Sequence, residues 1–149
     1  METGLVHLHS ALRWVLLVLL VASIVRAFTG TRSPKPYAGI KKLALFTLIS
    51  AHLQLVLGLV LYFVKGWNKQ WSNPEMMKTT LLRFFTMEHL VMMLLAITLI
   101  TMGYSGAKRM SDSKRQHKRI FTFFLIALIL ILASIPWPFR TALGAHNWF

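Results

Sequence analysis

Four apolar runs, each long enough to cross a lipid bilayer, constrain the fold of this chain more than any other feature. They cover roughly residues 5–28, 40–64, 81–104 and 120–135. An α-helix of about 20 apolar residues, rising about 1.5 Å per residue, spans the roughly 30 Å hydrocarbon core of a membrane. The runs and their short connections use the whole length, so we expect a single transmembrane domain over residues 1–149.

Composition supports a membrane protein built only from helices. The 149 residues are 56% hydrophobic and 14% charged, whereas a soluble domain is about 25% charged. Short connections favour antiparallel neighbours, so we predict an all-α, up-down four-helix bundle. The chain has no cysteine, which excludes disulfides, thiolate metal sites and a haem attached through a C-x-x-C-H motif.

Basic residues lie in the connections between the spans and predict the orientation of the chain. The net charge is +13, and most of the excess follows the first and third spans, at Arg26, Arg32, Lys35, Lys41, Lys42, Lys108, Arg109, Lys114, Arg115, Lys118 and Arg119. Cytoplasmic loops of membrane proteins carry such an excess. We therefore expect a multi-pass protein of the bacterial inner membrane, with both termini periplasmic. The basic charge contacts lipid headgroups rather than nucleic acid in this interpretation.

Aromatic residues and prolines support the same topology. Four tryptophans fall in connections or ends assigned to the exterior, where an aromatic belt forms at the membrane interface: Trp67, Trp71, Trp137 and Trp148. Pro136 and Pro138 should end the fourth helix, because proline cannot continue one.

The candidate functional residues are five ionisable side chains within the apolar runs. They are His9, Arg13, His52, Glu88 and His89. Ionisable groups at membrane depth are costly, so each is a functional hypothesis by default. Histidine is the commonest metal ligand, and the neutral imidazole tolerates apolar surroundings better than a charge does.

Helix rise converts these positions into depth. Counted from the exterior face, His9 lies roughly 6 Å and His89 roughly 10 Å into the membrane, and His52 roughly 18 Å. We therefore predict His9 and His89 as the axial pair of a haem iron held between helices, with His52 as the substitute ligand. Arg13 would neutralise a haem propionate, or it would form an ion pair with Glu88.

Two further positions complete the prediction. Small and polar residues form a stripe on the second span suited to close helix packing: Thr47, Ser50, Ala51, Gln54 and Gly58. Gln54 is the intramembrane polar group of that stripe. His117 lies in a basic run before the fourth span, where we expect it to be interfacial and solvated.

Four segments resemble a family of small four-span membrane proteins, common in Bacteroidota and labelled cytochrome b-like, with a loose similarity to cytochrome b561-type bundles. The segments are residues 7–14 (HLHSALRW), 51–58 (AHLQLVLG), 83–89 (RFFTMEH) and 133–139 (ASIPWPF). The resemblance implies haem b and electron transfer.

The leading hypothesis is a membrane b-type cytochrome that exchanges electrons with a quinol or a membrane partner. One alternative is a non-haem copper, zinc or iron site on His9, His52 and His89, with or without Glu88 as a further ligand. The other is an accessory subunit of a larger complex, in which Arg13, Glu88 and Gln54 hold helices together. The sequence lacks a nucleophile-base arrangement and a phosphate-binding loop, so electron transfer or an accessory role is favoured over a stand-alone enzyme.

Overall fold

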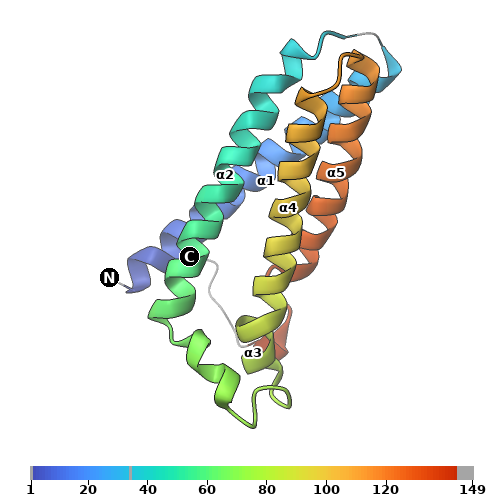
Figure 1. Ribbon diagram of the computed structural model, residues 1–149. Coiled ribbons are helices and arrows are strands. Elements are labelled where there is room, and N and C mark those ends of the chain that lie inside the picture. The colour runs from blue at the N-terminus through green and yellow to red at the C-terminus, as the bar shows by residue number, and fades with distance from the viewer. Residues whose placement is uncertain (1, 34, 144–149) are drawn as a thin grey trace.

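The computed structural model describes residues 2–33 and 35–143, and over these residues it is an up-down bundle of four long helical rods (Figure 1). The first two rods are α1 (Glu2–Arg32) and α2 (Ala38–Val64). The third is continuous and comprises α3 (Thr80–Arg83), the π-helical turn η2 (Phe84–Glu88) and α4 (His89–Lys108). The fourth is α5 (Ser113–Ser134), and short 3₁₀ turns form η1 (Trp67–Ser72) and η3 (Thr141–Leu143). The predicted all-α bundle is confirmed.

All four rods are long and apolar enough to cross a membrane. Their outward faces carry large apolar side chains, among them Val18, Leu53 and Ile129, each more than half exposed. Such faces are unfavourable in water and suited to lipid. The chain is therefore a multi-pass membrane protein.

The packing places α1 and α4 at opposite corners of the bundle. α1 packs against α2 and α5, and α4 packs against α5 and, more loosely, against α2. Fully buried alanines lie along the contacts, at Ala27, Ala44, Ala51, Ala96, Ala107 and Ala127. Small residues let membrane helices approach closely, because they add little bulk between two backbones.

The fourth rod begins earlier than its apolar run and ends where the prolines predict. Asp112 caps α5, its carboxylate accepting a hydrogen bond from the Arg115 backbone amide at 3.3 Å. The basic run that follows is thus helical. α5 ends at Ser134, just before Pro136.

Aromatic residues gather at the end of the bundle that carries η1 and the end of α5. Trp67 stacks on Phe85 with ring centroids 5.1 Å apart, and Trp137 stacks on Phe139 at 5.9 Å. The predicted belt residue Trp148 lies outside the described residues. This end has the composition of a membrane interface.

Candidate functional site

His9 of α1 is held by a buried side-chain amide, that of Gln54 on α2. The Gln54 Nε2 donates to the His9 backbone carbonyl at 3.0 Å and lies 3.3 Å from the His9 Nε2. One turn further along α2, Gly58 leaves room for the imidazole, since a Cβ there would lie 3.2 Å from the His9 Cε1. The His9 Nδ1 is buried and has no hydrogen-bond partner among the described residues.

The small, polar stripe of α2 packs closely against another helix, as predicted, and that helix is α1. Thr47, Ser50, Ala51 and Gln54 are all buried. The hydroxyls of Thr47 and Ser23 lie 2.9 Å apart across the two helices. Gln54 therefore acts both as a link between helices and as the immediate neighbour of His9.

His89 is anchored to another helix. Its Nδ1 donates to the Ser134 carbonyl of α5 at 2.8 Å. That carbonyl is available because α5 ends at Ser134, and the last carbonyls of a helix have no partner within it. With Nδ1 carrying the proton, Nε2 is left with a lone pair. Metal-binding histidines are held in this way, with the second nitrogen bonded to a carbonyl or carboxylate.

The structure brings the predicted pair together with Arg13. The imidazoles of His9 and His89 and the guanidinium of Arg13 lie within electrostatic reach of one another. They come from α1 and from the start of α4, at opposite corners of the bundle. This juxtaposition, which we call the His9–His89 cluster, comprises His9, Arg13 and His89.

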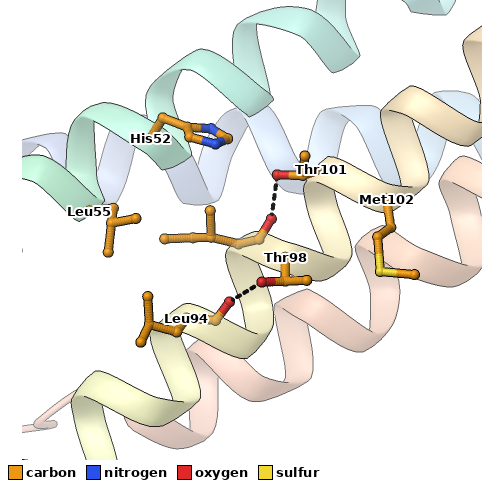
Figure 2. Close-up of a pocket in the computed structure, with 7 residues that line it drawn as sticks. His52, Leu55, Leu94, Thr98, Thr101 and Met102 are labelled. Atoms are coloured by element: carbon orange, nitrogen blue, oxygen red, sulfur yellow. Dashed lines mark hydrogen bonds between the residues drawn. The ribbon is translucent and has the colours of Figure 1, made fainter.

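His52 lies in a different place. It is exposed, its Nδ1 donates to the Leu48 carbonyl of its own helix at 2.9 Å, and its ring faces the groove between α2 and α4 (Figure 2). The groove has a pocket of about 230 Å³, lined by His52, Leu55, Leu94, Ile97, Thr98, Thr101 and Met102. Over the residues described, no three His, Cys, Asp or Glu side chains gather as a metal site would require.

Glu88 has a partner on its own rod rather than on α1. Its Oε1 lies 2.7 Å from the Arg83 Nε, and both side chains are partly exposed. Arg83 also donates to the Met77 carbonyl at 3.0 Å. The expected alternative, an ion pair between Arg13 and Glu88, is wrong because Arg83 lies nearer on the same rod and takes the carboxylate.

The π-helical turn η2 is a site feature that sequence reasoning missed. It occupies Phe84–Glu88, directly before His89. Tyr62 of α2 donates its hydroxyl to the Thr86 carbonyl at 3.1 Å, and the Trp71 indole donates to the Tyr62 hydroxyl at 2.7 Å. Turns of this kind are rare in proteins overall, but those that occur often lie at functional sites. No glycine or proline in the segment signals it.

His117 is buried rather than solvated, so that expectation is wrong. Its ring is 1% exposed, and its Nδ1 donates to the Ser113 carbonyl at 2.8 Å. It packs on Gly30, where a Cβ would lie 2.0 Å from the His117 Cδ2. Because Gly30 has no side chain, it leaves room for the His117 ring against α1. The basic residues around His117 gave no indication of this burial.

Comparison with known proteins adds no assignment. The chain matches no family model, no curated protein and no solved structure. The resemblance to the cytochrome b-like family stays a prediction.

Proposed function

We propose that the protein is a membrane-bound b-type cytochrome that carries electrons, with His9 and His89 as the axial ligands of one haem b. One observation carries the proposal: His89, oriented by the Ser134 carbonyl, lies within electrostatic reach of His9, whose Nδ1 is buried without a partner among the described residues. Two imidazoles on separate helices are a common way to hold a cofactor inside a bundle. The bound haem would supply a one-electron carrier.

The donor set fits this group in charge as well as in ligand type. Arg13 lies beside both histidines and would offset a propionate. The α1–α2 link through Gln54 holds the His9 backbone. Were the His9 Nε2 to hold the group, the Gln54 amide would have to turn away, since its nitrogen is 3.3 Å from that atom. The protein would set the potential through its axial ligands and this buried cation.

The orientation and partners belong to the same proposal. The basic connections should face the cytoplasm, so the His9–His89 cluster lies in the exterior half of a bacterial inner membrane. A quinol or a membrane electron-transfer protein would deliver electrons, within a larger complex or alone. The substitute ligand His52 lies at the lipid-facing groove, apart from the cluster.

A second candidate function, that of an accessory subunit, is supported by the contact between Gln54 and His9. The Gln54 amide bonded to His9 resembles a link that only holds α1 to α2, as an accessory subunit would need. In that case the polar groups would pack helices and bind no cofactor.

Optical spectroscopy separates the two functions. We expect the protein, purified from membranes or reconstituted with haemin, to give a sharp α-band on reduction with dithionite. The reason is that two imidazole ligands would make the haem iron low-spin. A lipid-loaded, folded protein that stays colourless and takes up no haemin would contradict the cytochrome proposal and favour the accessory role.

A further inference from the structure

A pocket of about 320 Å³ lies at the end of the bundle away from the His9–His89 cluster. This end is at the top of Figure 1. The pocket lies where α1 ends, α2 begins and α5 begins. Its wall is formed by Arg26, Lys35, Pro36, Ala38, Gly39, Ile40 and His117. Three of these side chains are basic or can become so, and none is acidic.

His117 is a buried polar group with one nitrogen unused. Its Nδ1 is taken by the Ser113 carbonyl, and its other nitrogen makes no hydrogen bond within the described part of the chain. Tyr37 packs edge-on against the ring, with centroids 6.5 Å apart. Burial raises the pKa of the Tyr37 phenol, and Tyr104 adds to the effect, so this neighbour stays uncharged. His117 thus lines the pocket with one ring nitrogen that has no hydrogen-bond partner in the described part of the chain and can meet a ligand there.

The two cations of the pocket are not neutralised by the protein. The chain has four acidic residues, and each carboxylate is paired elsewhere: Glu2 with Lys65, Glu75 with Lys78, Glu88 with Arg83 and Asp112 with Arg115. Asp112 comes closest in the fold, since the next residue, Ser113, donates to the Lys35 carbonyl. Among the residues described, Arg26 and Lys35 have no carboxylate partner.

Gly39 shapes the pocket around the guanidinium. A Cβ at Gly39 would lie 3.1 Å from the Arg26 Nη2, so the glycine lets Arg26 lie over the first turn of α2. The start of this 27-residue helix adds a weak positive potential to the same space. Arg26, Lys35 and the start of α2 thus border one small volume.

We propose that this pocket binds a phosphate group through Arg26, Lys35 and His117, either the phosphate of an anionic lipid headgroup or a free phosphate ion. Guanidinium and ammonium groups bind phosphate by charge-assisted hydrogen bonds. Basic pockets between membrane helices at the charged face of a protein bind anionic headgroups. The pocket lies at the end of the spans, where headgroups are found.

Calorimetric titration of the purified full chain tests the proposal with two probes. One is water-soluble dihexanoylphosphatidylglycerol and the other is inorganic phosphate, both in about 0.3 M salt to screen diffuse attraction. The test variant is R26Q/K35Q, whose side chains are exposed and whose loss should not unfold the bundle. The matched control is K108Q/R109Q, which removes the same charge from the other connection at this end, outside the pocket.

Each lost charge-assisted bond should weaken binding about tenfold, so R26Q/K35Q should bind roughly a hundredfold more weakly. The control should bind within about threefold of the parent. Saturable binding of the lipid alone identifies a headgroup, and binding of inorganic phosphate with equal strength identifies the free ion. Equal weakening in both variants, or no saturable binding of either probe, would overturn the proposal.

Discussion

Three histidines, His52, His89 and His117, donate a hydrogen bond from Nδ1 to a backbone carbonyl, and these bonds have two different effects. His52 and His117 each donate from Nδ1 to a carbonyl of their own helix, four residues back, at Leu48 and Ser113. His89 donates instead to Ser134 on a different helix. A bond within a helix fixes a rotamer, whereas a bond between helices also fixes the ring relative to the bundle. His89 is therefore the better oriented ligand candidate.

Gly30 and Gly4 give a matched test of packing on a single helix. An added Cβ at Gly30 would collide with the buried His117 ring, whereas one at Gly4 would meet nothing within 4 Å. We expect Gly30→Ala to lower the free energy of unfolding by about 1–3 kcal/mol, as overpacked cores do. Gly4→Ala should be neutral or slightly stabilising, because alanine favours a helix.

Thermal unfolding of both variants in the same detergent measures the difference. Equal stability of Gly30→Ala and Gly4→Ala would show that His117 does not pack on α1.

The pairing of Glu88 can be measured with a double-mutant cycle. The carboxylate lies 2.7 Å from Arg83, and both groups are partly exposed, so solvent screens the pair. We expect a coupling energy of about 0.5 kcal/mol between Arg83→Gln and Glu88→Gln. The same cycle between Arg13→Gln and Glu88→Gln should give a coupling near zero. A larger value for the second cycle would restore the ion pair across helices.

At the level of the element, the third rod is the least regular part of the bundle. Its π-helical turn places an extra residue before His89, so side chains on either side of the turn do not follow a single helical stripe. Tyr62 and Trp71 support the turn through a chain of two hydrogen bonds. The orientation of His89 thus depends on contacts from α2 and η1 as well as on α5.

Removal of the Tyr62 hydroxyl should loosen this turn. We expect Tyr62→Phe to raise the hydrogen-exchange rates of the amides of residues 84–88 about fivefold, because one hydrogen bond contributes about 1 kcal/mol. Tyr104→Phe, near the other end of α4, is the control and should leave those amides unchanged. Unaltered exchange in Tyr62→Phe would mean that the turn is held by packing alone.

Local patterns predicted the elements well because hydropathy, prolines and small residues act within a span. The polar stripe containing Gln54 is buried in a helix contact as expected, and α5 ends before Pro136. Contacts between residues far apart in the sequence could not be predicted from these local patterns. The burial of His117 depends on Gly30 of a distant helix, and the pairing of Glu88 depends on a turn that no residue type signals.

At the level of the whole molecule, two ends of different chemistry define the bundle. One end carries η1, Trp67, Trp71, Trp137 and the His9–His89 cluster. The other carries the basic connections and the pocket walled by Arg26 and Lys35. Most of the basic residues lie at the second end, an asymmetry that favours one orientation of insertion.

The absence of cysteine allows a clean test of orientation. Single cysteines at Ser33 or Ser111, both exposed at the basic end, should react with an impermeant maleimide only after the cells are opened. A cysteine at Ser72, exposed in η1, should react in intact cells. The reverse pattern would place the basic end outside and the His9–His89 cluster in the cytoplasmic half.

The haem content of three histidine variants tests directly whether His9 and His89 hold a haem. His9→Ala and His89→Ala, purified in parallel with His52→Ala and the parent, should lose the reduced α-band or retain only a weakened, high-spin haem. His52→Ala should keep the full haem content per chain, since its ring lies in a separate groove. A parent protein without haem, or haem retained in His89→Ala and lost in His52→Ala, would contradict the account.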